Sequence, residues 1–154
     1  MIVAQLMSRH LKTVTMDDSV QTVHRIFQVS SFHHLLVVSR SRVVGVVSDR
    51  DLLKNLSPFV GKLTERTQDL ALLRRRVHQI MTRSLVTVRA HTDMSAAVTL
   101  MVRRGLSCFP VVSAKGEPMG IITSRDILKW VGRSMSRAGL HNTPSPAEQL
   151  LCAP

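Results

Sequence analysis

The chain has 154 residues, 44% hydrophobic and 20% charged, which suits one compact unit or two small halves that share a core. Its 21 Lys and Arg against 10 Asp and Glu give a formal net charge of +11, which attracts nucleotides, nucleic acids or anionic membranes. Aromatic residues make up only 3%, with no Tyr, which argues against stacking platforms for single-stranded nucleic acid.

The location of the protein is inferred from its cysteines and its apolar segments. Cys108 and Cys152 form neither a CxxC pair nor a disulfide framework, which indicates a reducing compartment. No apolar run approaches the roughly 18 to 20 residues of a membrane-spanning helix, and the first residues lack a basic stretch followed by an apolar core. We therefore expect a soluble, cytoplasmic protein without membrane association.

The first predicted strand begins an internal repeat. The stretch "QLMSRHLKTV" (5–14) matches "QIMTRSLVTV" (79–88), and "GVVSDRD" (45–51) matches "GIITSRD" (120–126), with one residue inserted in the turn between the two matches. The chain is therefore a tandem duplication. Its predicted parts are a first repeat at 1–54, a linker at 55–76, a second repeat at 77–133 and a flexible tail at 134–154.

Each repeat is predicted to contain a strand, a helix, two strands and a second helix. The first strand lies at "KTVT" or "LVTV", and the following helix is capped by Asp17 or Asp18 in the first repeat and by Thr92 or Asp93 in the second. Gly105 is expected to end the second of these helices. Two β-branched runs then form an antiparallel hairpin, and the last helix begins at the "GVVSDRD" or "GIITSRD" motif.

The strands are apolar on successive residues, as in "LLVV" and "VVGVV", which indicates burial on both faces of the sheet. A repeat of a little over 50 residues cannot cover both faces by itself. We therefore expect an α+β, sandwich-like fold in which two pseudo-twofold repeats pack their sheets face to face. Such a pair leaves two equivalent clefts, each lined by one copy of the motif.

The linker is predicted to resume a helix, because Leu70, Leu73, Val77 and Ile80 follow helical spacing. Its other face carries Arg74–Arg76. This cluster has two interpretations: contact with nucleic acid or ligand phosphates, or a solvated helix face that joins the repeats.

The motif of Gly, two apolar residues, Ser or Thr, two variable residues and Asp resembles the tandem cystathionine-β-synthase (CBS) domain pair, or Bateman module. The heads "LMS…TV" and "IMT…TV" and the run "LSCFPVV" fit the same family. The resemblance covers nearly the whole chain apart from the linker and tail. It implies two clefts that bind adenine nucleotides, and pairing of two modules into a flat disk of four repeats.

The motif supplies residue types that suit a nucleotide. Asp51 and Asp126 are the candidates for the ribose hydroxyls, and Ser48 and Thr123 stand at helix N-termini, where a phosphate is favoured. The same spacing is that of a capping box, in which hydroxyl and carboxylate satisfy the first turn of the helix. Both interpretations remain open from the sequence.

Further site residues follow from the motif and from the resemblance. Arg50 and Arg125 precede the aspartates and either add charge to the phosphates or point into solvent. The resemblance places against the adenine Thr13, Val14, Thr87 and Val88, and on the other wall His33, His34 and Leu36 in the first repeat and Ser107, Cys108, Phe109 and Pro110 in the second.

The two clefts are not expected to be equal. Pro110, which is usual in the family, is replaced by Leu36 in the first repeat, where His33 and His34 also add bulk. We therefore expect the second cleft to be occupied first. Adjacent strand residues face opposite sides, so the histidine pair predicts no metal site, although Mg²⁺ can accompany the phosphates of ATP. Cys108 is predicted to be a small buried hydrophobic residue.

No catalytic constellation is visible, because each cleft offers one carboxylate and one hydroxyl without a positioned base. The sequence thus predicts a non-enzymatic regulatory module that binds AMP, ADP or ATP and senses energy state or a metabolite. Ligand-dependent conformation of a homodimer would signal to a separate effector protein. Two alternatives remain: a nucleic-acid-binding protein that uses the basic surface, and a structural dimerisation module with vestigial clefts.

Overall fold

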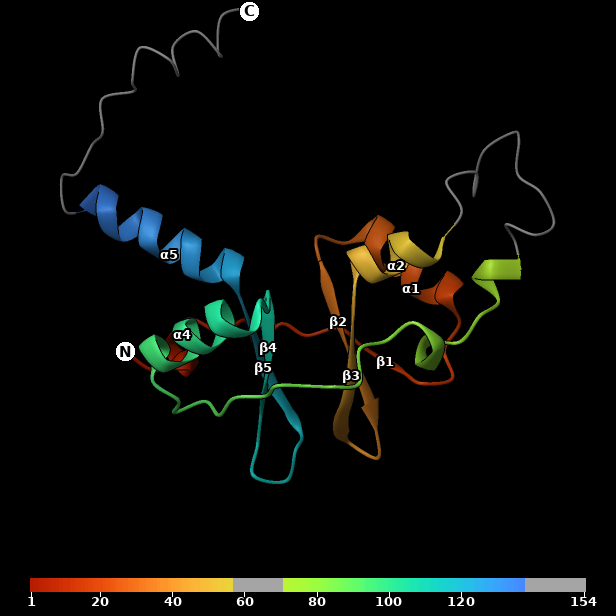
Figure 1. Cartoon of the computed structure of the whole chain (residues 1–154), viewed down its shortest axis with the longest axis horizontal. Helices are drawn as coiled ribbons and strands as arrows, with labels where there is room; N and C mark the ends of the chain where they lie inside the picture. The colour runs from red at the N-terminus through yellow and green to blue at the C-terminus, as the bar shows by residue number, and fades with distance from the viewer. Residues whose placement is uncertain (57–70, 138–154) are drawn as a thin grey trace, which may run out of the picture.

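The computed structural model describes residues 1–56 and 71–137 (Figure 1). The first repeat contains β1 (Thr13–Thr15), α1 (Val20–Val29), β2 (His34–Ser39), β3 (Arg42–Ser48) and α2 (Asp49–Asn55). The second contains α4 (Met94–Arg104), β4 (Cys108–Val112), β5 (Pro118–Thr123) and α5 (Ser124–Arg137). Each repeat is preceded by a short 3-10 helix, η1 (Val3–Gln5) or η2 (Val77–Gln79).

The strands form two small sheets. In the first, β1 runs parallel to β2, and β2 pairs antiparallel with β3 through a two-residue turn in which Arg40 and Ser41 both have positive φ. In the second, β4 and β5 form the predicted antiparallel hairpin. Both sheets stand at the centre of the molecule, with α1 and α2 at one outer side and α4 and α5 at the other (Figure 1).

The strand predicted at 85–88 is wrong: only Val88 pairs with β4, through a single parallel bridge to Val111. The equivalent strand β1 is longer because the backbone N–H of Leu36 donates to the carbonyl of Lys12 at 3.3 Å. Its counterpart in β4 is Pro110, which has no N–H to donate. The parallel ladder of the second repeat is therefore shorter.

The helix caps agree with the prediction in one repeat only. Ser19, not Asp17 or Asp18, is the N-cap of α1, and its side-chain oxygen accepts a backbone N–H of the first turn. In the second repeat, the predicted Asp93 caps α4, and Gly105 ends it in the left-handed conformation with φ of 61°.

The two repeats exchange their N-terminal arms, residues 3–8 and 77–82. Val3 is completely buried in the core of the second repeat, and its N–H donates to the carbonyl of Thr92 at 2.9 Å. Val77 is completely buried in the core of the first repeat, and its N–H donates to the carbonyl of Asp18 at 2.9 Å. Each folded unit therefore combines the body of one repeat with the arm of the other.

The arms explain the glycine that begins each motif. A Cβ at Gly45 would lie 2.7 Å from Sδ of Met81, which belongs to the second arm. A Cβ at Gly120 would lie 2.7 Å from Sδ of Met7 and 3.0 Å from the backbone oxygen of Ser8 in the first arm. The glycine of each motif thus leaves room for the methionine of the arm from the other repeat.

A third core joins the sheets of the two repeats. Leu36 and Val46 of the first sheet pack with Ile121 of β5, and Cys108 adds a partly buried contact. The α+β architecture with packed sheets is therefore confirmed, and this third cluster joins the two repeats.

The predicted linker helix through Ile80 is wrong, while 57–70 lies outside the described residues. Residues 71–73 are helical, and the chain then turns before η2. The Arg75 guanidinium donates to Oδ1 of Asn55 at 3.0 Å, and that of Arg76 donates to the carbonyl of Asp17 at 2.7 Å. These two arginines hold the linker against the first repeat and do not form a solvated helix face.

The boundary predicted for the tail also differs from the structure. The helix α5 continues to Arg137, four residues into the range 134–154. The rest of the predicted tail, 138–154, lies outside the described residues.

Candidate functional site

A cavity of about 880 Å³ lies between the two repeats, where the first turns of α2 and α5 approach each other. The predicted arrangement was one copy of the motif in each cleft, but this cavity is lined by both copies. The motif residues in its lining are Ser48, Asp49 and Arg50 from the first copy and Ile121, Thr123, Ser124, Arg125 and Asp126 from the second.

Both copies of the motif form a capping box. Oδ2 of Asp51 accepts from the backbone N–H of Ser48 at 2.9 Å and from its hydroxyl at 2.6 Å, while the Asp51 N–H donates back to that hydroxyl at 3.1 Å. Asp126 and Thr123 repeat the pattern at 2.9, 2.6 and 3.2 Å. In both aspartates Oδ2 is used by the cap, and within the described residues nothing donates to Oδ1.

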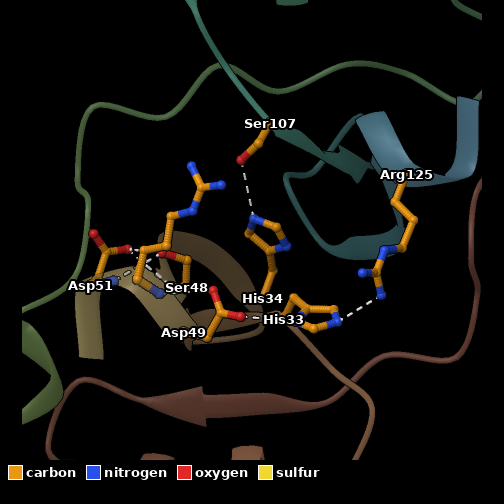
Figure 2. Close-up of polar contacts among 8 residues, drawn as sticks. His33, His34, Ser48, Asp49, Asp51, Ser107 and Arg125 are labelled. Carbon is orange, nitrogen blue, oxygen red and sulfur yellow. Dashed lines mark hydrogen bonds and ion pairs between the residues drawn. The ribbon is translucent and has the colours of Figure 1, made fainter. Parts of the chain in front are cut away.

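His33 lines the cavity and connects the two repeats (Figure 2). Its Nδ1 lies 2.8 Å from Oδ2 of Asp49, and its Nε2 lies 2.9 Å from Nη1 of Arg125. Partial burial raises the pKa of Asp49, but the hydrogen bonds from His33 and from the backbone N–H of Arg50 outweigh it and hold the pKa below its ordinary value. Asp49 is therefore a carboxylate at neutral pH.

His34 makes a second contact between the repeats, with Nε2 3.3 Å from Oγ of Ser107 (Figure 2). Burial lowers the pKa of His34 below its ordinary value, against the opposing attraction of the Asp49 carboxylate. The expectation that the two histidines face opposite sides of a strand is wrong, because β2 begins at His34 and His33 precedes it. Both side chains line the cavity.

Several residues in the lining were missed from the sequence, among them Asp49, Lys129 and His10. Lys129 lies one helical turn after Arg125, and this i, i+4 spacing on α5 could have identified it. His10 stacks on Phe32, with ring centroids 5.5 Å apart and planes 18° from parallel. Only the tertiary structure brings this pair to the cavity, since nothing in the local pattern of either residue predicts it.

Comparison with known proteins identifies the fold. The model of the CBS domain family matches residues 3–58 and 77–133, well over half of the chain. The chain belongs to the CBS domain family. A CBS domain-containing protein of Dictyostelium discoideum is 32% identical over 130 residues, which cover 82% of this chain and 88% of that protein.

Solved structures show the same paired arrangement. The CBS domain pair of protein MJ0100, in complex with 5′-methylthioadenosine and S-adenosyl-L-methionine, matches with a TM-score of 0.72 at 23% identity, covering 87% of this chain and 98% of that one. The cytosolic domain of the Mg²⁺ channel MgtE in complex with ATP matches with a TM-score of 0.62 at 28% identity, covering 81% of this chain and 46% of that one. This chain spans 46% of the next curated relative and 24% or less of the six that follow.

The predicted site residues of this CBS pair divide into two groups. Those that line the cavity are His33, His34, Ser48, Arg50, Ser107, Thr123, Arg125 and Asp126. Those outside its lining are Thr13, Val14, Leu36, Asp51, Thr87, Val88, Cys108, Phe109 and Pro110. Several of the second group are core residues, since Val14, Leu36, Val88, Phe109 and Pro110 are buried.

Cys108 lies in the core between the two CBS repeats and is partly buried. Burial, aided by the negative charge of Asp51, raises the pKa of its thiol to about 12, so the sulfur is not a thiolate at neutral pH.

In the described ranges, no three His, Cys, Asp or Glu side chains lie together in a way that could hold a metal ion. No helix in the described part of the chain has the length and apolarity to cross a bilayer.

Proposed function

We propose that this CBS domain pair is a regulatory module that binds an adenine nucleotide of the AMP, ADP or ATP type in the cavity between its repeats. The observation that carries the proposal is the lining of one cavity by both copies of the motif. Its size lies within the range of about 300 to 1,000 Å³ that is usual for small-molecule sites. The adenosine-containing ligands of the two solved relatives support the same class of ligand.

The side chains in the cavity suit the parts of a nucleotide. Arg50, Arg125 and Lys129 supply positive charge for phosphates. Oδ1 of Asp126 is available to accept from ribose hydroxyls while Oδ2 keeps the cap of α5. Asp51 lies outside the lining, so the second copy of the motif supplies the ribose contact. Mg²⁺ can accompany the phosphates of ATP.

The proposed mechanism is a shift between conformations and involves no chemical step. A ligand that contacts the first turns of α2 and α5 together stabilises one relative position of the two repeats. It changes the population of conformers only by the difference between its affinities for them. A separate effector protein would read this change, and so the module would report energy state or the level of a metabolite.

We also propose that the signalling unit is a homodimer, supported by α5. This helix has no buried residue, and its apolar side chains include Leu128 at 69%, Met135 at 49% and Trp130 at 40% exposure. Sedimentation velocity should show a dimer for the wild type and a monomer for Leu128→Glu. Arg133→Gln, on the basic side of the same helix, is the control expected to remain dimeric.

Calorimetric titration with AMP, ADP and ATP tests nucleotide binding. Arg125→Gln and Asp126→Asn should each weaken binding about 10- to 100-fold, since each removes a charged partner while Asn still offers an oxygen to the cap. Asp17→Asn, with an exposed side chain outside the cavity, is the control and should bind as the wild type does. The proposal fails if no nucleotide binds below about 1 mM, a weak affinity on the usual scale, or if both cavity variants bind normally.

A nucleic-acid-binding function is the second candidate, favoured by a basic stripe on α5. Its members are spaced four residues apart and so share one side of the helix: Arg125, Lys129, Arg133 and Arg137. The affinity for duplex DNA or RNA would then fall steeply with salt. A plot of the logarithm of the binding constant against the logarithm of the salt concentration would steepen by about 0.9 for each phosphate contacted. A charge-reversed pair, Arg133→Glu with Arg137→Glu, should reduce this slope without changing nucleotide affinity.

A further inference from the structure

The contacts of His33 determine which nitrogen of its ring carries the proton. The guanidinium of Arg125 can only donate, so Nε2 of His33, 2.9 Å from Nη1, must accept. In the neutral ring the proton is then on Nδ1, which donates to Oδ2 of Asp49 at 2.8 Å. Both contacts together therefore require a neutral His33 in the Nδ1–H form.

Protonation affects the two contacts in opposite ways. A protonated His33 donates from both nitrogens, so it keeps and strengthens its bond to the Asp49 carboxylate. Its Nε2 can no longer accept, and two cationic groups then face each other. The contact with Arg125 is therefore lost when the ring becomes charged.

We propose that His33 is a proton-sensitive latch on Arg125, so that phosphate-bearing ligands bind the cavity more tightly as the pH falls. The inference rests on the proposed function, because it concerns how that site receives an anion. With neutral His33, the guanidinium is held by the ring and a ligand phosphate has to compete for it. With charged His33, Arg125 is released, and the imidazolium itself adds positive charge to the wall.

The groups around His33 come from every element that borders it. They are Asp49 and Arg50 on α2, His34 on β2, Arg125, Asp126 and Lys129 on α5, and His10 in the N-terminal segment. Asp49 is the carboxylate in direct contact with His33, and Arg125 is the cation in direct contact. The balance between these two partners therefore sets the state of the latch.

The latch joins the two repeats and has no second copy across the pseudo-twofold relation. Ser107 occupies the position of His33 in the second repeat, and Arg50 occupies that of Arg125 in the first. The side chain of Arg50 donates to no acceptor within the described ranges, whereas Arg125 is held. Of these two arginines, Arg125 is the one whose availability to a ligand depends on the charge of His33.

Two substitutions separate the two sides of the ring. His33→Gln offers an amide oxygen near the position of Nε2, so it still accepts from Arg125 but does not titrate. His33→Asn offers an amide N–H near the position of Nδ1, so it can donate to Asp49 but leaves Arg125 without its acceptor. The first imitates the closed latch at every pH and the second imitates the open one.

The test is calorimetric titration of the full chain with ATP at pH 8 and pH 6, the range over which imidazole changes charge. From pH 8 to pH 6 the wild type should gain about tenfold more in affinity than His33→Gln, the order of one charge-assisted hydrogen bond. His33→Asn should bind more tightly than His33→Gln at pH 8. The ATP phosphate changes charge in the same way with all three proteins, so the test compares the pH dependence of affinity between the proteins. A wild-type pH dependence in His33→Gln would overturn the proposal.

Adenosine is the matched ligand without phosphate, and its affinity should not differ between the wild type and His33→Gln at either pH. Nitrogen-15 NMR of the imidazole, without any ligand, gives an independent readout. At pH 8 we expect His33 to be protonated at Nδ1 and bare at Nε2, and an Nε2–H ring would overturn the latch. If neither the wild type nor the variants bind ATP, the proposed function fails. The tautomer measured by NMR still shows whether Nε2 of His33 accepts from Arg125.

Discussion

The glycine that begins each motif is explained by the close approach of two chain segments. A Cβ added at Gly45 or at Gly120 would lie 2.7 Å from a methionine sulfur of the exchanged arm. Neither glycine has a positive φ. Space, and not backbone conformation, therefore excludes a side chain at these two positions.

Gly120→Ala should lower the free energy of unfolding by about 1 to 3 kcal/mol, the usual cost of overpacking. The added Cβ would meet Sδ of Met7 at 2.7 Å and the carbonyl of Ser8 at 3.0 Å, and that carbonyl is held by the N–H of Ile121. Urea unfolding measures the change. Gly132→Ala in α5, where nothing lies within 4 Å, should instead stabilise by about 0.5 to 1 kcal/mol. Equal stability of the two variants would contradict this explanation.

The partial burial of His34 predicts that the stability of the protein depends on pH. Burial lowers the pKa of His34 below 6.5, so below that pH the unfolded chain binds more protons than the folded chain. The stabilisation is complete above about pH 6.5 and is lost as the pH falls through the folded-state value. The urea midpoint of the wild type should therefore fall between pH 7.5 and pH 5.5, and that of His34→Gln should fall less. His91→Gln, on an exposed loop, is the control, and an equal decline in both variants would exclude His34 as the cause.

The spacing of the motif could predict the local structure of the site but not its use. Ser48 with Asp51 and Thr123 with Asp126 were expected to form either capping boxes or ligand contacts, and the boxes are present. The ligand contacts stay a prediction, which the caps do not exclude, because a cap occupies only one oxygen of the carboxylate. A sequence pattern therefore cannot decide whether a ligand takes the other oxygen.

At the scale of whole elements, the exchange of arms was not predictable from the repeat. The arms 3–8 (VAQLMS) and 77–82 (VHQIMT) are so alike that either could pack on either body with nearly the same side chains. The order strand, helix, strand, strand and helix needs only local pattern and was mostly correct. The shortened ladder at Val88 could have been anticipated, since Pro110 visibly lacks the required donor.

The exchange predicts that each arm stabilises the other repeat. Val3→Ala should cost about 1 to 3 kcal/mol and increase hydrogen exchange in α4 and β4, while Val77→Ala should do the same in α1 and β2. Both valines are completely buried, so each substitution leaves a cavity. Exchange mass spectrometry locates the effect. If each variant loosened the repeat to which it belongs in sequence, the assignment of the arms would be wrong.

At the scale of the whole molecule, both copies of the motif line one cavity, whereas the repeat predicts one copy in each of two clefts. The pseudo-twofold relation is real in the sheets and capping boxes, but the cavity walls are unequal, with His33 and His34 opposite Ser107. Comparing the two repeats in sequence identifies the residues that they share. Which of the differing residues contact each other is known only from the folded structure.

A shared cavity predicts that one ligand stabilises both repeats together. ATP at 100 times its dissociation constant should raise the free energy of unfolding by about 2.7 kcal/mol, through mass action alone. Because the first turns of α2 and α5 both line the cavity, hydrogen exchange at 48–51 and at 123–126 should slow in parallel as ATP is added. Asp126→Asn should weaken the protection of both segments equally. Protection confined to the second repeat would show that the repeats bind independently, and then no ligand could couple their positions.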